Sequence, residues 1–166
     1  LNVERGEVVF WVGSADYRSP DAGQVDHVSA LRQPGSTLKP FLYALALERG
    51  FKLDQSLPDR RAYFKTAAGH YRPTNYNHQT QGEVSLMSAL AQSLNIPSVW
   101  LLNQVGVDAL LETLRGAGLE SLNQDASHYG LGLSLGDGDV SLIDLVNAYR
   151  GLMLGGLYTP WHATLK

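Results

Sequence analysis

The chain has 166 residues, a formal net charge of -3 at pH 7, 44% hydrophobic residues and 17% charged residues. These values are typical of a globular domain, and they exclude the strongly basic surface that binds nucleic acid or an anionic membrane. The chain contains no cysteine, which excludes disulfides and thiolate metal sites, and it has no apolar run long enough to span a bilayer.

The first predicted element is a strand at Glu7–Ser14, a run rich in Val, Phe and Trp that follows Arg5-Gly6. Asn2-Val3 is expected to end a preceding strand that pairs with it. Residues 15–27 have the glycine, proline and aspartate content of a loop. The first part of the chain therefore predicts a hairpin and a connection to the next element.

The next predicted element is a helix from Ser36 to Arg49, which starts after the Pro34-Gly35 turn. Ser36 and Lys39 are separated by one helical turn, so their side chains lie on one face. We expect the hydroxyl and the amine to meet at the helix N-terminus. The helix is apolar on most sides, which predicts that it lies buried in the centre of a domain.

A serine hydroxyl becomes a nucleophile when a neighbouring base removes its proton. Lys39 can be that base if its pKa is lowered, and two effects act in that direction: burial against Phe41 and Leu42, and the positive end of the helix dipole. Backbone donors at the same helix end can stabilise an oxyanion. The pattern Ser-x-x-Lys is short, however, and by itself it also fits a helix cap followed by a solvated lysine.

Residues 51–80 are predicted to be irregular, with one short strand at Ala62–Phe64. This segment holds a cluster of tyrosine, arginine and asparagine that is a candidate substrate wall: Tyr71, Arg72, Asn75 and Tyr76. An equally good interpretation is a loop that packs on the domain through its own aromatic side chains.

A helix is predicted at Val84–Leu94, with Ser85 as its N-cap. Ser93 and Asn95 come at its end, where Ile96-Pro97 is expected to stop it. Three more helices are predicted at 98–105, 107–115 and 142–154, the last capped by Ser141 with Asp144 as its capping-box partner. A strand pair followed by mostly helices indicates the α+β class.

Two further patterns are interpreted as having no catalytic role. Residues 121–123 repeat the Ser-Leu-Asn of residues 93–95, but they lie in a polar turn. Residues 132–136 match the Gly-x-Ser-x-Gly nucleophile elbow, but a loop follows them where the elbow requires a helix. The five histidines show no ligand spacing, so no metal site is expected.

Several of these segments together point to one family. The segment 32–47, RQPGSTLKPFLYALAL, resembles the active-site serine segment of penicillin-binding protein transpeptidase domains, most closely those of class A, the bifunctional type. Residues 6–14 are similar to the first strands of that domain. Residues 71–76 resemble the segment between its first two catalytic motifs, and residues 88–99 resemble its second motif, Ser-x-Asn. The four segments follow one another in the family's order.

The resemblance implies part of the penicillin-binding/serine transpeptidase fold, an antiparallel sheet beside a helical subdomain. It makes residues 1–166 the N-terminal and helical part of a transpeptidase domain. The family's third motif, Lys-Thr/Ser-Gly, has no match after Asn95, and it is expected with the later strands beyond Lys166. The resemblance also implies a full-length protein with a glycosyltransferase domain and a membrane anchor, at the periplasmic (extracytoplasmic) face of the inner membrane.

By the same resemblance, Ser36 forms an acyl-enzyme in a serine D,D-transpeptidase that cross-links peptidoglycan stem peptides and that β-lactams acylate. Lys39 is implied as the base, Ser93 as the proton relay toward the leaving amine, and Asn95 as the residue that holds the site together. No metal or cofactor is implied. Two alternatives stay open: a non-catalytic penicillin-binding or sensor-like module, and a β-lactamase-type hydrolase of the same superfamily.

Overall fold

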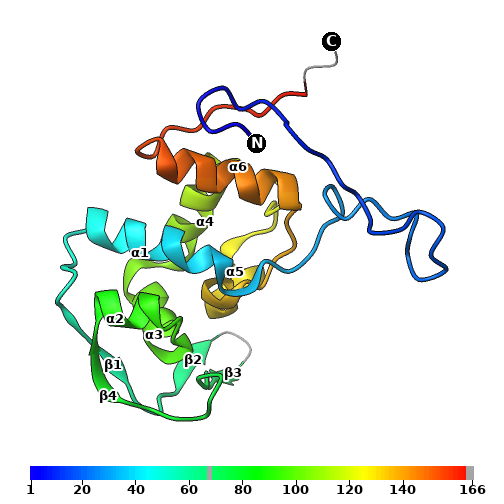
Figure 1. Cartoon of the computed structure of the whole chain (residues 1–166). Helices are drawn as coiled ribbons and strands as arrows, with labels where there is room; N and C mark the ends of the chain where they lie inside the picture. Colours follow the sequence, from blue (N-terminus) through cyan, green and yellow to red (C-terminus); the bar gives the residue numbers. More distant parts are fainter. Residues whose placement is uncertain (67–68, 164–166) are drawn as a thin grey trace. The chain divides into compact units, whose positions relative to one another are not determined.

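The computed structural model of the chain describes residues 1–66 and 69–163. The chain divides into two compact units. The terminal unit consists of Leu1–Gln33, Leu114–Asn123 and Asp139–Lys166, and the central unit consists of Pro34–Thr113 and Gln124–Gly138. The described residues form helices and short antiparallel sheets, which confirms the α+β class predicted from the sequence (Figure 1). Across residues 1–66 and 69–163, we find no helix of the length and apolar character that crossing a bilayer requires.

The central unit begins with a 3₁₀ turn, η1 (Gly35–Leu38), that continues directly into α1 (Lys39–Glu48). The helix predicted from Ser36 to Arg49 is therefore confirmed, with a 3₁₀ first turn. Pro40 is tolerated because the first α-helical turn does not use its missing N–H. The buried residues of α1 are Lys39, Phe41, Leu42, Tyr43, Leu45 and Ala46. The helix is thus buried on most sides, as its apolar composition predicts.

Three further helices follow: α2 (Leu86–Ala91), α3 (Asn95–Val105) and α4 (Val107–Gly116). The predicted N-cap of α2 is confirmed, since the Ser88 N–H donates to Ser85 Oγ at 3.1 Å. The predicted start of the next helix at Ser98 is wrong, because α3 already begins at Asn95. Pro97 lies in its first turn, where a proline does not interrupt a helix. α3 packs against α1 in the core of the central unit.

Two small antiparallel sheets lie between residues 56 and 85, where the sequence predicted mostly irregular structure up to residue 80. The helix predicted to start at Val84 begins only at Leu86, because Val84 and Ser85 belong to β4. β1 (Ser56–Asp59) pairs with β4 (Gly82–Ser85), with Asp59 opposite Gly82, and β2 (Phe64–Thr66) pairs with β3 (Gly69–Tyr71). Figure 1 shows β1 and β4 running side by side below α2 and α3. The short strand predicted at 62–64 is displaced to 64–66, and β1 was not predicted, since its partner lies far along the chain.

Before the last helix, the chain forms α5 (Ala126–Tyr129), and the glycine-rich run that follows forms the 3₁₀ turn η2 (Gly130–Leu135). Ser134 is fully buried, and its hydroxyl donates to the Leu131 carbonyl at 2.8 Å. A nucleophile elbow needs an exposed serine, so this arrangement agrees with the prediction that residues 132–136 have no catalytic role. Gly136 approaches the backbone of Gly35 so closely that a Cβ at position 136 would collide with it. The glycine therefore lets η2 pack against the turn that carries Ser36.

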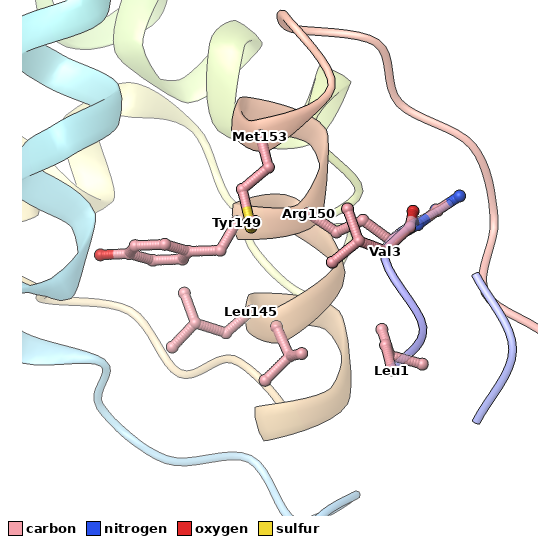
Figure 2. A pocket seen from close by; sticks show the side chains of 7 residues that line it. Leu1, Val3, Leu145, Tyr149, Arg150 and Met153 are labelled. Carbon is pink, nitrogen blue, oxygen red and sulfur yellow. Dashed lines mark hydrogen bonds between the residues drawn. The ribbon is translucent and has the colours of Figure 1, made fainter. Parts of the chain in front are cut away.

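The terminal unit is built around α6 (Leu142–Met153). Its predicted N-cap is confirmed, because the Asp144 N–H donates to Ser141 Oγ at 3.2 Å. The Asp144 carboxylate accepts from the Ser141 hydroxyl at 2.6 Å, where a full capping box would have it accept from the Ser141 backbone N–H. Arg150 of this helix is buried, and its Nε donates to the Val3 carbonyl at 2.6 Å. Figure 2 shows the apolar pocket where Leu1 and Val3 lie beside α6.

The strand predicted at Glu7–Ser14 is wrong. Among the described residues, this segment forms one isolated bridge, between Glu7 and His162, and no strand. Phe10 and Val12 are exposed at 86% and 72%. A β-prone composition makes a strand when a partner supplies a ladder of hydrogen bonds, and here the pairing is limited to the bridge at one end of the segment.

Candidate active site

Lys39, the first residue of α1, is 1% exposed. Its Nζ donates to the Ser93 carbonyl at 2.6 Å, to Ser93 Oγ at 3.1 Å and to Asn95 Oδ1 at 2.8 Å. These acceptors match the three donors of a lysine ammonium. Burial lowers the pKa of Lys39 to about 8, because removal from water penalises the charged form. The predicted lowering of this pKa is therefore confirmed, and burial is its cause.

Ser93 lies just after α2, with a φ of 52° in the left-handed region. Its N–H donates to the Leu90 carbonyl at 2.9 Å, and the Leu94 N–H donates to the Ala89 carbonyl at 3.0 Å. This pair of bonds is a Schellman motif, in which the left-handed residue is usually glycine. A serine costs about 1–2 kcal/mol of conformational energy at such a position. The turn brings both the carbonyl and the hydroxyl of Ser93 to the Lys39 amine.

Asn95 is the first residue of α3, and its side-chain amide connects two segments. Oδ1 accepts from Lys39 Nζ, and Nδ2 donates to the Thr74 carbonyl at 2.9 Å. A carbonyl can only accept a hydrogen bond. Thr74 therefore determines which way the amide faces, and it leaves the oxygen of Asn95 for the lysine.

Ser36 lies in η1, one turn before Lys39, and is exposed. Its carbonyl accepts from the Lys39 backbone N–H. Over residues 1–66 and 69–163, its hydroxyl has no hydrogen-bond partner, so the predicted contact with the lysine amine is not formed here. Catalytic hydrogen bonds are often formed only when substrate is bound. The structure thus gathers Lys39, Ser93 and Asn95 into one cluster and leaves the Ser36 hydroxyl open to a ligand.

The candidate substrate wall divides into exposed and buried members. Tyr76 is 99% exposed, and the Arg72 guanidinium lies 5.1 Å from the centre of the Tyr63 ring. Tyr71 is half-buried in β3, and its pKa is raised by burial and then by the Asp137 carboxylate. These side chains can contact a ligand at the surface of the central unit.

Asn75, the fourth member of that predicted wall, is 3% exposed. Its Oδ1 accepts from the backbone N–H groups of Asn95 at 2.9 Å and Ile96 at 3.2 Å. Its Nδ2 donates to Asp59 Oδ1 at 2.7 Å. The side chain therefore supports the residues around the lysine from inside the unit.

A family model described as the penicillin binding protein transpeptidase domain matches residues 1–164 of the chain. The chain belongs to this family. The family predicted from the sequence is thereby confirmed. The matched residues include Lys39 and its two hydrogen-bond partners, Ser93 and Asn95.

Curated relatives and solved structures that are similar to the chain are also penicillin-binding proteins. Penicillin-binding protein 1C of Escherichia coli K12 is 38% identical over 151 residues, which are 88% of this chain and 19% of that protein. The crystal structure of penicillin-binding protein 1A from Haemophilus influenzae matches with a TM-score of 0.72 and 27% identity, covering 84% of this chain and 20% of that one. PonA1 of Mycobacterium tuberculosis, solved in complex with penicillin V, has a TM-score of 0.70 and 26% identity, covering 82% and 39%. The chain spans about a fifth of the length of the curated relatives it matches.

Sequence reasoning missed two contributors to the cluster around Lys39. Thr74 acts through its backbone carbonyl, which no side-chain pattern reveals. Asp59 is fully buried on the same face of β1 as Leu57. The alternation Leu57-x-Asp59 is the signal that an inward-facing carboxylate would give in a strand, but the strand itself had to be recognised first.

Proposed function

We propose that this chain carries the acylating nucleophile of a serine D,D-transpeptidase of peptidoglycan cross-linking, with Ser36 as the attacking residue. The observation that carries the proposal is the buried Lys39 amine, held by Ser93 and Asn95 one turn from an exposed serine. A lysine whose pKa is lowered to about 8 is neutral in a useful fraction of molecules near neutral pH. Such an amine can accept the proton of a serine hydroxyl.

The proposed first step transfers the Ser36 hydroxyl proton to Lys39 while Ser36 Oγ attacks the penultimate carbonyl of a D-Ala-D-Ala stem peptide. The peptide C–N bond then breaks, the leaving D-alanine amine takes up a proton, and the acyl group stays on Ser36 as an ester. In the next step, the amine of a second stem peptide attacks this ester and forms the cross-link, and the proton that the amine loses returns to Ser36 Oγ as the serine is released. The proposed steps use side chains of this chain alone.

Ser93 is proposed to carry the proton from Lys39 to the leaving amine. Three acceptors surround the Lys39 amine, and two of them, the Ser93 carbonyl and Asn95 Oδ1, cannot donate a hydrogen bond. The Ser93 hydroxyl can both accept and donate. It is therefore the group in this cluster that can pass a proton onward. Asn95 is proposed to hold the amine in place.

The substrates proposed are peptidoglycan stem peptides, with β-lactams as acylating inhibitors. Tyr71, Arg72 and Tyr76 are proposed to contact the stem peptide, since they lie at or near the surface of the segment that also supplies Thr74. The full-length protein is proposed to carry a membrane anchor and a glycosyltransferase domain, and to act at the periplasmic face of the inner membrane, as class A family membership suggests. Residues 1–166 would then form the N-terminal and helical part of its transpeptidase domain.

The test is the intact mass of the full-length protein after incubation with penicillin. We expect one covalent adduct on Ser36 and none in Ser36→Ala. Ser127→Ala, which removes an exposed serine on α5, is the matched control and should react like the parent. An adduct that persists in Ser36→Ala would overturn the assignment. D-alanine release and cross-linking, measured on stem-peptide substrate, then distinguish a transpeptidase from a sensor that is acylated and does not turn over and from a hydrolase that loses the adduct quickly.

A further inference from the structure

The Asn75 side-chain amide is saturated with hydrogen bonds inside the central unit. Besides its bonds to Asn95, Ile96 and Asp59, its Nδ2 donates to the Gln79 carbonyl at 2.8 Å. An asparagine amide has two acceptor sites and two donors, and all four are in use. Asn75 is therefore placed to organise its neighbours, and its amide has no group left for a substrate.

Asn75 caps α3 from outside the helix. The residue at the N-cap position is Leu94, whose side chain cannot accept a hydrogen bond. The first backbone N–H groups of a helix have no partner within it, and here they belong to Asn95 and Ile96, since Pro97 has none. Asn75 Oδ1 accepts from both. The backbone of the residue that binds the Lys39 amine is thus held by a side chain from a segment 20 residues earlier.

Asp59 determines the orientation of the Asn75 amide. Its Oδ1 accepts from Asn75 Nδ2 at 2.7 Å, and its Oδ2 accepts from the Gln81 N–H at 2.8 Å. A carboxylate can only accept, and the N–H groups of α3 can only donate. The Asn75 amide therefore fits between them in one orientation, with its nitrogen toward Asp59 and its oxygen toward the helix.

The same segment also orients the Asn95 side chain. Thr74 precedes Asn75, and its carbonyl accepts from Asn95 Nδ2. If Asn75 shifts, the Thr74 carbonyl shifts with it because the two residues are joined by a peptide bond. The position of Asn75 therefore controls both the backbone of Asn95 and the direction of its amide toward Lys39.

We propose that Asp59 and Asn75 are positioning residues for acylation: Asp59 fixes the Asn75 amide, and Asn75 with Thr74 holds Asn95 Oδ1 against the Lys39 amine. The inference rests on the proposed function of Lys39 as the base, and it assigns Asn75 a supporting role in place of the substrate contact predicted from the sequence. It also links the β1–β4 sheet, which supplies Asp59, to the reacting groups.

The experiment exchanges the two side chains in the full-length protein. In Asn75→Asp, the carboxylates of residues 59 and 75 face each other, and neither can donate a hydrogen bond. In Asp59→Asn, the new amide nitrogen faces either Asn75 Nδ2 or the Gln81 N–H, so two donors face each other. In the double variant, residue 59 can donate to residue 75 and still accept from Gln81, and residue 75 can still accept from α3. The bond to the Gln79 carbonyl is the one that the exchange does not restore.

Each single variant is expected to lower the second-order rate of acylation by penicillin, by about 10-fold to 100-fold if Asn95 moves by an ångström. The double variant is expected to recover most of that loss. Asp59→Asn should also shift the rising limb of the rate against pH toward lower pH, because an ammonium that loses an acceptor has a lower pKa, whereas Asn75→Asp adds a carboxylate that opposes this shift. A variant that is merely less stable lowers the amplitude of the profile and leaves its midpoint in place.

Hydrogen exchange of the Asn95 and Ile96 amides separates this inference from the proposed function. We expect faster exchange in each single variant and restored protection in the double variant, whether or not the protein reacts with penicillin. Failure of the parent to form an adduct would therefore sink the proposed function alone. The positioning role would be overturned if the double variant recovered amide protection but neither the acylation rate nor the midpoint of its pH profile. It would also be overturned if the single variants matched the parent. Asn103→Asp, the same change at an exposed site on α3, is the control and should behave like the parent.

Discussion

The tripeptide Ser-Leu-Asn occurs twice in this chain, at residues 93–95 and 121–123, and the two copies have different surroundings. Their leucines are alike, since Leu94 is 7% exposed and Leu122 is 0% exposed. Their serines differ. Ser93 Oγ accepts from the buried Lys39 amine, whereas the Ser121 hydroxyl donates to the Asp139 carbonyl at 2.8 Å. One copy belongs to the hydrogen-bonded cluster around Lys39, and the other closes a turn.

The difference comes from elements outside the tripeptide. Ser93 follows α2 in the left-handed conformation, which Ser121 does not adopt. α1 supplies the amine that donates to Ser93. Asn95 starts α3, and its amide is directed by Thr74. A short polar pattern thus predicts chemistry when the elements on both sides and a partner from a distant segment are considered together.

The largest expected effect comes from removing the amine that distinguishes the first copy. Lys39→Met keeps an unbranched side chain of similar volume and leaves Ser93 and Asn95 without their donor. We expect the rate of acylation by penicillin to fall by about 10³-fold to 10⁴-fold, the upper part of the range for general base catalysis. Stopped-flow measurement with a chromogenic β-lactam gives the rate. A loss below tenfold would show that Lys39 is not the base.

The same lysine predicts a pH dependence in the parent protein. In the proposed mechanism, acylation requires the neutral amine, and the pKa of Lys39 is about 8. The rate should therefore rise as the pH increases through about 8 and level off above it, and it should fall about tenfold per pH unit well below 8. In Lys39→Met, the residual acylation rate should no longer rise as the pH increases through about 8. A parent profile that is flat between pH 6 and pH 9 would contradict the assignment of the base.

The next effect compares the two serines directly. Ser93→Ala removes the hydroxyl that we propose passes the proton, and we expect the acylation rate to fall by about 10²-fold. Ser121→Ala makes the same chemical change in the second copy and should leave the rate within twofold of the parent. Equal rates in the two variants would mean that the Ser93 hydroxyl has no part in proton transfer, and that its carbonyl alone holds the lysine.

Much of this cluster was predictable because its elements carry local signals. The Pro34-Gly35 turn and the apolar run after it predicted the helix that holds Lys39, and the low pKa of the lysine followed from its burial. The end of α2 placed Ser93 and Asn95 next to a helix boundary. These signals are contained in a few consecutive residues, and the helices that they specify are stabilised by burial of one apolar face.

The parts that were missed depend on pairing across the chain. β1 and β4 are short, and each is determined by the other strand, so neither gives a periodic signal of its own. The segment at 7–14 shows the reverse case: its composition is typical of a strand, but pairing stops at the bridge from Glu7 to His162. The hydrogen bonds of Asp59 arise from tertiary contacts that local patterns do not contain. The left-handed turn at Ser93 is local, but it lacks the glycine that usually marks such a helix end.

The smallest expected effect concerns that turn, and it compares glycine with alanine at each serine. Ser93→Gly and Ser93→Ala both lose the hydroxyl, so any difference in stability between them reports the backbone. Glycine adopts a φ of 52° without strain, and alanine does not, so the glycine variant should be more stable by about 1 kcal/mol in denaturant unfolding. At Ser121 the order should reverse, because glycine gains conformational entropy in the unfolded chain without relieving strain in the folded one. The same order at both positions would mean that the left-handed turn at Ser93 is unstrained, and that its serine is retained without a conformational cost. The predicted reversal would instead mean that the copy beside Lys39 holds a strained serine where glycine would be more stable, as expected if the hydroxyl has the proposed role in proton transfer.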